Sequence, residues 1–375
     1  MTDLRVAVVG VGGIGQAHLF AVTSIDGMTL AGVCDADAER AARAASDHDT
    51  IVFNTFTTLC SSGEVDAVVI ATPPATHAPL VREAIEAGVH VYCEKPFTLI
   101  ARDGYELGQL AAERGVVVQV GLQFRYHRAY AAMRHMVTGG DTGELFRANL
   151  LATNWFRAQE YFAASPWRSA WRSSGGGVLI TQAIHQLDAL ITTVGMPSRV
   201  HAGWYCAAHV AEVEDELHAM LEWPNGARGT LSASMNDPAG REEFALHGDR
   251  GAVIVQDYDF RRAEYESVQR TIKESEEEFP SVTAVWEQVP IERKSSEWFD
   301  MIIDCHRDFA RAITDGIPNA IPPMEGTRVV ELVNACYLSA AHDQPVALPL
   351  AGDEYATTFD RLGDGSLAVP GLPIA

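Results

Sequence analysis

The stretch that decides the fold reads Val6-Ala7-Val8-Val9-Gly10-Val11-Gly12-Gly13-Ile14-Gly15, an apolar run that ends in a glycine pattern. A helix-compatible segment follows, then a second apolar run at residues 30–34, and then Asp35. This order is typical of one βαβ unit: a strand, the glycine pattern Gly10-x-Gly12-x-x-Gly15, a helix, a second strand, and an acid twenty residues after the last glycine. This order predicts a parallel sheet with a dinucleotide-binding turn.

Each part of the pattern has its own physical role. Gly10 permits the tight turn, Gly12 has no side chain to keep a pyrophosphate from the backbone, and Gly15 lets the helix pack close to the strand. The helix N-terminus offers unpaired N–H groups to the phosphates. Asp35 can accept hydrogen bonds from both ribose hydroxyls, and its charge would repel a 2′-phosphate. We therefore expect NAD rather than NADP, bound by Gly10, Gly12, Gly13, Ile14, Gly15 and Asp35.

Composition limits the possible partners. The chain has 375 residues, of which 47% are apolar, so it can build more than one full core. Its formal net charge of -22 argues against nucleic acid or an anionic membrane as a partner. Six widely spaced cysteines without a C-x-x-C pair suit reduced thiols, and no signal peptide or membrane-spanning run is recognisable. We expect a cytoplasmic protein.

Strand and helix patterns keep alternating through the first third of the chain. Strand-like runs at 65–72, 89–93 and 116–120 are separated by helical segments at 78–87 and 101–114. This alternation predicts a doubly wound parallel sheet in a nucleotide-binding domain over residues 1–122. Ligands of such sheets lie at the carboxyl ends of the strands. The residues that follow strand ends, and should therefore line one crevice, are Thr72, Pro73, Glu94, Lys95 and Gly121.

The pattern changes after residue 122. Strand-like runs at 216–223 and 229–234 flank Pro224-Asn225-Gly226, a strong hairpin signal, and another follows at 251–255. Helical patterns cover 298–315 and 327–341, and the charged stretch 261–281 is interpreted as a solvated excursion. We predict an α+β domain over residues 123–375, with a largely antiparallel open sheet and helices on one face. An exposed sheet face would favour a homodimer or homotetramer.

These motifs resemble the glucose-fructose oxidoreductase / inositol dehydrogenase (Gfo/Idh/MocA) family over nearly the whole chain. The resemblance rests on the glycine pattern, on Ala71-Thr72-Pro73-Pro74 with His77, on Glu94-Lys95-Pro96, and on Gly175-Gly176-Gly177-Val178-Leu179-Ile180-Thr181-Gln182-Ala183-Ile184-His185-Gln186-Leu187-Asp188. It implies that Lys95 and His185 flank the nicotinamide and that the substrate is a polyol, a sugar or a sugar derivative. The further cofactor-binding residues that it implies are Thr72, Pro73, His77, Glu94, Lys95 and Gln123.

One position departs from the family pattern. The family commonly has an acid four residues before the histidine and a glycine two before it, where this chain has Thr181 and Ala183. We expect Thr181, His185 and Asp188 to lie on one face of a helix that begins just after Gly177. Because threonine cannot accept a proton at neutral pH, His185 would act as the base without an acidic partner.

The expected chemistry explains the residue types. Oxidation of a secondary alcohol requires removal of the hydroxyl proton as the C–H bond breaks, and imidazole is basic near neutral pH, which suits His185. An ammonium group beside the same oxygen stabilises the developing alkoxide, the role we expect for Lys95. The alternatives are a Lys95 that only pairs with Glu94 and a His185 that is satisfied within its own helix.

Aromatic residues and arginines are dense between the two predicted domains. Tryptophan faces suit the C–H faces of a sugar ring, and guanidinium groups suit carboxylate, phosphate or sulfonate. An anionic substrate is one interpretation of this cluster; structural ion pairs and a packed domain junction are the other. The expected substrate-binding residues are Lys95, Arg125, Tyr126, Trp155, Arg157, Trp167, Arg168, Trp171, Arg172, Thr181, Gln182 and His185.

A metal site is not expected. Acids and imidazoles cluster at His209, Glu212, Glu214, Asp215, Glu216 and His218. Strand alternation would separate Glu214 and Glu216 from Asp215, and nothing sets a tight ligand spacing. A half-exposed strand is the simpler interpretation.

The sequence thus predicts an NAD-dependent oxidoreductase acting on a secondary hydroxyl of a sugar, sugar derivative or cyclitol. Two alternatives stay open. One is a redox-neutral, NAD-dependent glycosidase that oxidises the ring transiently and eliminates the aglycone, as some relatives of this family do. The other is a non-catalytic NAD-binding sensor, which the presence of both Lys95 and His185 argues against.

Overall fold

The computed structural model describes residues 3–257, 259–292 and 295–371. The first two residues of the predicted nucleotide-binding domain and the last four of the second domain lie outside these ranges. The chain forms two compact units. Unit 1 comprises residues 1–123, 172–175 and 294–330, and unit 2 comprises 124–171, 176–293 and 331–375. The first junction lies beside the predicted boundary at 122/123, but unit 1 also takes in two later segments.

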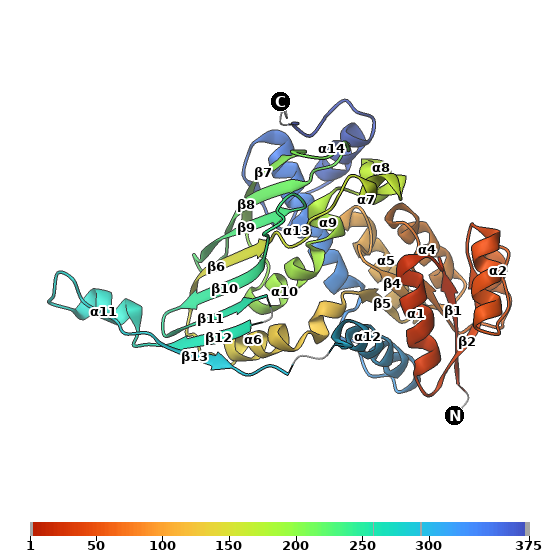
Figure 1. Ribbon diagram of the computed structural model, residues 1–375, viewed down its shortest axis with the longest axis horizontal. Coiled ribbons are helices and arrows are strands. Elements are labelled where there is room, and N and C mark those ends of the chain that lie inside the picture. The colour runs from red at the N-terminus through yellow and green to blue at the C-terminus, as the bar shows by residue number, and fades with distance from the viewer. Residues whose placement is uncertain (1–2, 258, 293–294, 372–375) are drawn as a thin grey trace. The chain divides into compact units, whose positions relative to one another are not determined.

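Unit 1 is built on a five-stranded sheet of order β2-β1-β3-β4-β5 (Figure 1). Every neighbouring pair of strands in it is parallel, which confirms the predicted doubly wound sheet. The sheet and its connections comprise β1 (Leu4–Val9), α1 (Gly13–Ser24), β2 (Met28–Cys34), α2 (Ala38–Asp47), α3 (Phe56–Ser61), β3 (Ala67–Ile70), η1 (Pro74–Thr76), α4 (His77–Glu86), β4 (His90–Glu94), α5 (Ala101–Arg114) and β5 (Val118–Gly121).

A helix from the far end of the chain completes unit 1. Helix α12 (Glu297–Thr314) packs on α1, where Ile302 meets Ala17 and Ala21 in one buried cluster. The same helix contacts the sheet, since the side-chain amide of Gln119 donates to the carbonyl oxygen of Cys305 at 2.7 Å. Helix α13 (Pro323–His342) begins in unit 1 and ends in unit 2.

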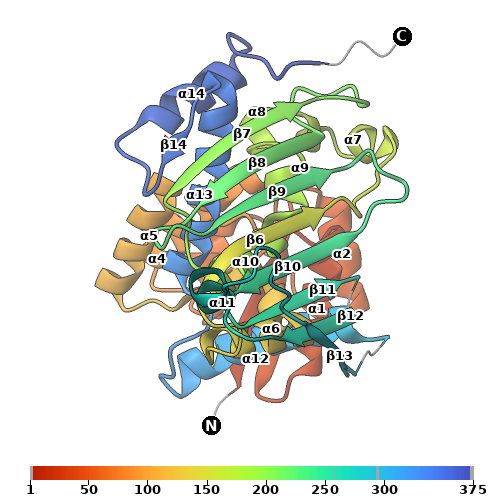
Figure 2. The same ribbon diagram turned by 90° about the vertical axis from the view of Figure 1, so that its left-hand side faces the viewer.

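Unit 2 is built on a nine-stranded sheet of order β13-β12-β11-β10-β6-β9-β8-β7-β14, whose strands lie side by side in Figure 2. Only the pair β6 and β9 is parallel, so the prediction of a largely antiparallel sheet is confirmed. Its strands are β6 (Leu145–Ala152), β7 (Arg199–Tyr205), β8 (Glu216–Glu222), β9 (Arg228–Ser234), β10 (Glu242–Gly248), β11 (Gly251–Gln256), β12 (Asp259–Glu264), β13 (Val285–Val289) and β14 (Val346–Ala347).

Helices α6 and α10 pack against the strands of this sheet. The described helices of this part of the chain are η2 (Gln123–Tyr126), α6 (Arg128–Thr138), α7 (Glu160–Ala163), η3 (Pro166–Ser169), α8 (Trp171–Ser174), α9 (Val178–Thr181), α10 (Ile184–Val194), α11 (Val268–Glu274) and α14 (Glu354–Gly363). Asn225 and Gly226 turn the chain between β8 and β9, which pair antiparallel, so the predicted hairpin is confirmed.

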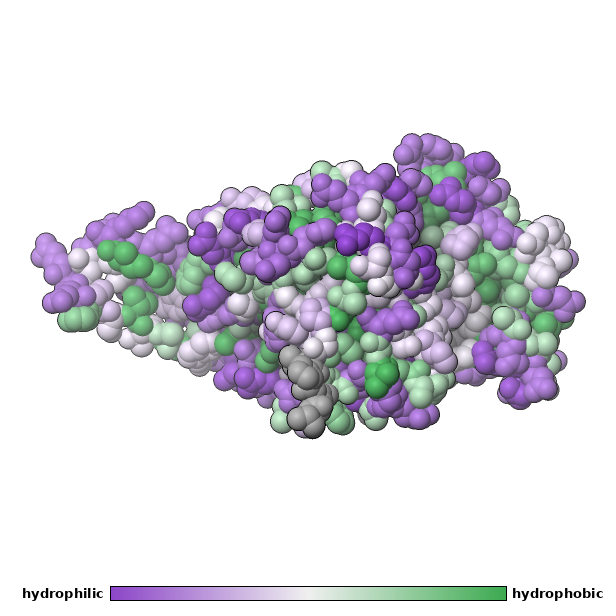
Figure 3. All heavy atoms as spheres, turned by 90° about the horizontal axis from the view of Figure 1, so that it is seen from above, coloured by the Kyte–Doolittle hydropathy of each residue, from purple (hydrophilic) through white to green (hydrophobic). Residues whose placement is uncertain are grey.

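The predicted solvated excursion is wrong at its start and right further along. Residues 261–264 belong to β12, which pairs with β11, whereas α11 buries none of its side chains. Exposed apolar side chains, including Ile272 and Phe279, lie in the segment from α11 to β13. Green spheres among purple ones are visible at the left of Figure 3, the side on which Figure 1 places α11.

Candidate functional site

The glycine turn in unit 1 has the geometry that a dinucleotide requires. Gly10 adopts φ +84°, and a Cβ on Gly15 would lie 2.0 Å from the carbonyl oxygen of Gly10. Side chains are therefore excluded at both positions. A Cβ on Gly13 would meet nothing within 4 Å, and no side chain caps the N-terminus of α1 at Gly12. The free N–H groups and the open space above them fit a pyrophosphate.

Asp35 connects this turn to the end of β2. Its carboxylate accepts hydrogen bonds from the backbone N–H of Val11 at 2.8 Å and of Asp37 at 2.9 Å. The guanidinium of Arg40 lies 3.3 Å from one of its oxygens. Arg40 also lies 3.4 Å from the other oxygen, so each carboxylate oxygen already has two donors, and a ribose hydroxyl would take the place of the long Arg40 contact.

His77 joins the two loops that follow β3 and β4. Its Nδ1 lies 2.7 Å from the carbonyl oxygen of Pro96, and its Nε2 lies 2.8 Å from that of Thr72. The ring is 1% exposed. Burial lowers the pKa of His77, against hydrogen bonds with Pro96 and Thr72 that raise it. His77 thus ties the loop that contains Thr72 and Pro73 to the loop that contains Lys95.

Glu94 belongs to a buried hydrogen-bonded chain. One carboxylate oxygen lies 3.0 Å from Nε2 of His18, and the other accepts the backbone N–H of Lys95 at 3.1 Å. Nδ1 of His18 lies 2.9 Å from Nε2 of His306 in α12. Burial raises the pKa of Glu94, but the hydrogen bond and charge of His18, with those of Lys95, outweigh it and lower the pKa. Glu94 is therefore an ionised anchor for the Lys95 backbone.

Two further predicted positions in unit 1 agree with this arrangement. Gly121 pairs with Glu94 across β4 and β5, and a Cβ there would lie 2.8 Å from the Glu94 carboxylate. Gln123 is 3% exposed, and its side-chain oxygen has no hydrogen-bond partner among the described residues. A buried amide oxygen of this kind is an acceptor that a bound carboxamide can satisfy.

In unit 2 the glycine-led segment differs from the predicted single helix. Helix α9 ends at Thr181 and α10 begins at Ile184, and the backbone N–H of Ala183 reaches back to the carbonyl oxygen of Val178 at 3.0 Å. This hydrogen bond skips one residue more than an α-helix does, as in a π-bulge. Thr181 and His185 therefore do not share the face of one regular helix, and that expectation is wrong.

The side chains around the interruption between α9 and α10 make contacts within unit 2. The hydroxyl of Thr181 donates to the carbonyl oxygen of Gly177 at 2.6 Å. His185 is 5% exposed and stacks on the ring of Phe124, with centroids 4.6 Å apart. Asp188 forms a bidentate ion pair with Arg125, the closest contact being 2.7 Å. Asp188 and Arg125 thus satisfy each other's charge within unit 2.

Glu214 holds the start of α9 in place. Its buried carboxylate accepts the backbone N–H of Gly177 at 2.7 Å and of Leu179 at 3.0 Å, and the hydroxyl of Tyr337 at 2.8 Å. Its own carbonyl oxygen accepts the N–H of Val178 at 3.0 Å. Burial raises the pKa of Glu214 to about 7, against these hydrogen bonds. The acids weighed as a metal cluster include this structural anchor, which the sequence pattern did not identify.

The aromatic and arginine residues divide into two groups. Trp171 is 1% exposed and lies in the core against Trp204 and Tyr337, and Arg172 is exposed in a segment assigned to unit 1. Arg157 and Arg168 instead flank the ring of Tyr161, with guanidinium carbons 5.5 Å and 4.3 Å from its centroid.

Arg157 and Arg168 have no acidic partner in the described part of the chain. Arg157 also lies 5.5 Å from the ring of Trp155 and donates to the side-chain oxygen of Gln182 at 2.8 Å. Arg168 lies 5.3 Å from the ring of Trp167 and donates to the carbonyl oxygen of Tyr161 at 3.0 Å. Over residues 3–257, 259–292 and 295–371, neither guanidinium meets a carboxylate. Two positive charges therefore remain uncompensated around one tyrosine.

The described residues contain neither a membrane-spanning helix nor a metal-binding cluster. None of the helices there combines the length and the hydropathy needed to cross a membrane. Within the same residues, no group of three or more histidine, cysteine or acidic side chains is placed to hold a metal ion.

Comparison with known proteins agrees with this geometry. Residues 4–122 match a model described as an oxidoreductase family NAD-binding Rossmann fold, and residues 134–348 match the C-terminal alpha/beta domain of the same family. The chain is 32% identical to inositol 2-dehydrogenase 3 of Saccharopolyspora erythraea over 68% of this chain and 73% of that protein. It is 33% identical to the UDP-N-acetylglucosamine 3-dehydrogenase of Acidithiobacillus ferrooxidans over 64% of this chain and 71% of that protein.

A solved structure extends the comparison to the whole fold. The WlbA dehydrogenase from Bordetella pertussis, in complex with NADH and UDP-GlcNAcA, superimposes with a TM-score of 0.80 at 25% identity, covering 93% of this chain and 100% of that one. These matches agree with three features of the structure, which are the glycine turn, the Glu94-Lys95-Pro96 loop and the second sheet. The chain belongs to the Gfo/Idh/MocA family of oxidoreductases, with an NAD-binding Rossmann domain followed by the family's C-terminal alpha/beta domain.

Proposed function

We propose that the protein is an NAD-dependent dehydrogenase that oxidises a secondary hydroxyl of an anionic sugar derivative. The observation that carries the anionic character is the pair of guanidinium groups, Arg157 and Arg168, that flank Tyr161 without a carboxylate partner in the described chain. Unpaired guanidinium groups beside aromatic rings suit a carboxylate or phosphate attached to a sugar ring.

The proposed catalytic groups are His185 and Lys95. Bound NAD supplies the hydride acceptor for the C–H bond of the substrate. His185 takes the hydroxyl proton, and the ammonium of Lys95 stabilises the negative charge that develops on the same oxygen. Thr181 uses its hydroxyl on the Gly177 carbonyl oxygen, so we assign it no proton-transfer role.

Fewer residues are proposed to contact the substrate than the sequence predicts. Arg125 is neutralised by Asp188, and Trp171 lies in the core, so neither is proposed to contact substrate. Arg157, Arg168 and Gln182 form the proposed polar subsite, and the rings of Trp155 and Trp167 lie beside the two guanidinium groups. The proposal also draws on the WlbA dehydrogenase, whose solved complex contains the acidic nucleotide sugar UDP-GlcNAcA.

The test is a screen that pairs uronates, sugar phosphates and acidic nucleotide sugars with neutral counterparts, with NADH formation as the readout. We expect turnover of the acidic members, with KM raised roughly tenfold to a thousandfold in Arg157→Ala or Arg168→Ala. Arg228→Ala, which removes an exposed arginine of the same unit, is the matched control. Equal or better turnover of neutral sugars would contradict the proposal, and aglycone release without net NADH would identify the glycosidase instead.

A further inference from the structure

The loop between β7 and β8 is folded around one buried carboxylate. Asp215 has a fully buried side chain and accepts the backbone N–H groups of Ala207 at 2.6 Å, Ala208 at 2.9 Å and His209 at 3.0 Å. These bonds lower the pKa of Asp215 to about 2 although burial raises it, with the His209 ring as the main favourable partner. The loop therefore has a defined conformation, and Asp215 is ionised throughout the neutral range.

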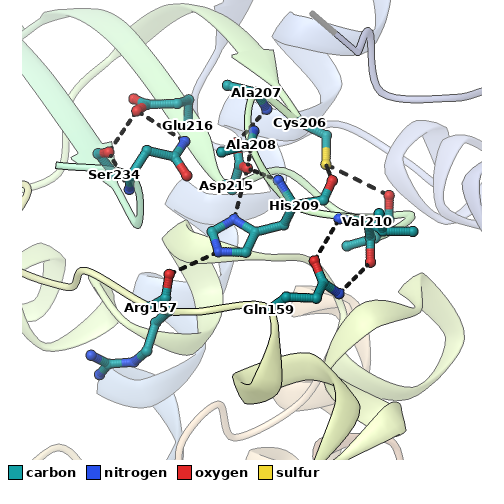
Figure 4. A network of polar contacts seen from close by, with 12 residues as sticks. Arg157, Gln159, Cys206, Ala207, Ala208, His209, Val210, Asp215, Glu216 and Ser234 are labelled. Atoms are coloured by element: carbon teal, nitrogen blue, oxygen red, sulfur yellow. Dashed lines mark hydrogen bonds and ion pairs between the residues drawn. The ribbon is translucent and has the colours of Figure 1, made fainter. Parts of the chain in front are cut away.

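His209 lies between two groups that can only accept hydrogen bonds. Its Nδ1 is 2.9 Å from an oxygen of Asp215, and its Nε2 is 3.0 Å from the backbone carbonyl oxygen of Arg157 (Figure 4). A neutral imidazole carries one N–H and can satisfy only one of these acceptors. Both contacts are made only by the doubly protonated ring, which pairs with the Asp215 charge.

The surroundings of the ring agree with that protonation state. The hydrogen bond from His209 to Asp215 raises the pKa of His209, burial opposes it, and the Arg157 carbonyl and the Asp215 charge add to the increase. The ring of Phe162 packs edge-on at 5.2 Å, and the thiol of Cys206 donates to the His209 carbonyl oxygen rather than to the imidazole. Among the described residues, Asp215 is the charged group in contact with the ring.

The loop between β7 and β8 also contacts residues 157–169 at further points. The side-chain amide of Gln159 donates to the carbonyl oxygen of Val210 at 3.1 Å and accepts the Val210 N–H at 2.8 Å. The N–H of Glu212 donates to the carbonyl oxygen of Ser169 at 2.9 Å. Residues 157–169, which include Arg157, Tyr161 and Arg168, are therefore fastened to this loop on both sides of Tyr161.

Arg157 is fixed at its backbone and directed away at its side chain. Its N–H donates to the carbonyl oxygen of Met235 at 3.0 Å, and its own carbonyl oxygen accepts from His209. Figure 4 shows its guanidinium turned away from the imidazole, and that group reaches Gln182 instead. A displacement of the Arg157 backbone would consequently move the guanidinium out of the subsite around Tyr161.

We propose that His209, held by Asp215, is a positioning residue that sets the place of Arg157 for binding an anionic group. His209 does not itself touch the substrate; it acts through the Arg157 carbonyl oxygen. This inference rests on the proposed function, since it gives Arg157 the role of an anion ligand.

The test measures the binding of inorganic sulfate to the full-length protein by calorimetry, because sulfate stays ionised across the pH range used and needs no turnover. We expect Arg157→Ala and His209→Gln each to weaken sulfate binding about tenfold at pH 6.5, the second because it removes one of the two N–H donors. His218→Gln, which changes an exposed histidine of the same sheet, should leave the affinity unchanged. Melting temperatures of all variants report separately on folding.

The pH dependence provides a readout that a merely structural role would not give. Because the pKa of His209 is raised, both contacts are present at low pH and one is lost as the pH rises through that value. Sulfate affinity of the wild type should fall as the pH is raised above the ordinary imidazole range, and the affinity of His209→Gln should be low and independent of pH over the same titration.

The outcomes separate this inference from the proposed function. If the wild type binds no sulfate, or if Arg157→Ala binds it normally, the anionic-substrate proposal fails and this inference fails with it. If Arg157→Ala weakens binding while His209→Gln binds like the wild type, the positioning role alone is overturned. A wild-type pH profile that persists unchanged in His209→Gln would likewise overturn it.

Discussion

Several single residues of unit 1 act on two neighbours at once. Asp35 accepts the N–H of Val11 in the glycine turn and also contacts the guanidinium of Arg40. His77 spans the carbonyl oxygens of Thr72 and Pro96. Replacing such a residue therefore changes both its own contact with a ligand and the loop that it holds.

Asp35→Ser should reduce the preference for NAD over NADP. The carboxylate would accept from ribose hydroxyls and repel a 2′-phosphate, and its removal leaves Arg40 paired with Asp37 but no longer with Asp35, so that Arg40 attracts a 2′-phosphate more strongly. Titration of both cofactors against the wild type and the variant measures the effect, and Asp47→Ser, which changes an exposed acid at the end of α2, is the control. Tighter binding of NADP than NAD by the wild type would contradict the assignment.

Lys95→Ala and His185→Ala should each keep NAD binding and lose turnover on the order of a hundredfold or more, because each acts where charge develops. Thr181→Ala should cost much less, because its hydroxyl is used within α9. Steady-state rates over a range of pH, together with NAD affinities, check both statements. Near-normal activity of His185→Ala at every pH would place the base elsewhere, with Tyr126 or His127 as the next candidates.

At the scale of helices and strands, features determined by neighbouring residues could be predicted from the sequence, whereas features that depend on a distant residue could not. The glycine turn and the Asn225-Gly226 hairpin are determined by neighbouring residues, and both appear as the sequence indicates. The start of α9 depends on Glu214, which lies in another part of the chain and accepts the N–H groups of Gly177 and Leu179. A helical pattern carries no information about such a distant acceptor.

Gly177→Ala should displace the start of α9 and with it His185. A Cβ at this position would lie 1.7 Å from the carbonyl oxygen of Glu214, a backbone atom that cannot turn aside. We expect the free energy of unfolding to fall by about 3 kcal/mol and turnover to fall with it. Denaturant unfolding and kinetics measure both effects. Gly203→Ala, where a Cβ meets nothing within 4 Å, is the control, and equal behaviour of the two variants would refute the argument.

At the scale of the whole molecule, neither compact unit is formed by one continuous stretch of the chain. The sequence suggested one cut at residue 122, whereas unit 1 also includes residues 294–330. The contact between His18 and His306 joins positions 288 apart, and Ile302 fills the space beside Ala17 and Ala21. Nothing in the amphipathic pattern of α12 identifies which sheet it packs against, so this pairing could not be predicted.

A fragment of residues 1–122 should therefore fail to melt cooperatively and should bind NAD poorly. Without α12 it exposes the apolar side of α1 and leaves His18 without His306. Joining residues 1–123 to residues 294–330 through a flexible linker should restore both properties. Circular dichroism melting curves and NAD titrations compare the two fragments. A cooperative, NAD-binding 1–122 fragment would show that α12 is dispensable for this unit.

The late position of α12 also has a consequence for synthesis on the ribosome. The five parallel strands emerge first, but the helix that covers α1 is translated only after most of unit 2. During that interval the nascent nucleotide-binding half presents an uncovered apolar surface, a surface of the kind that chaperones recognise and that drives aggregation. Translation pauses before residue 297 would prolong that exposure, so the yield of native protein depends on how quickly the ribosome reaches the last fifth of the chain.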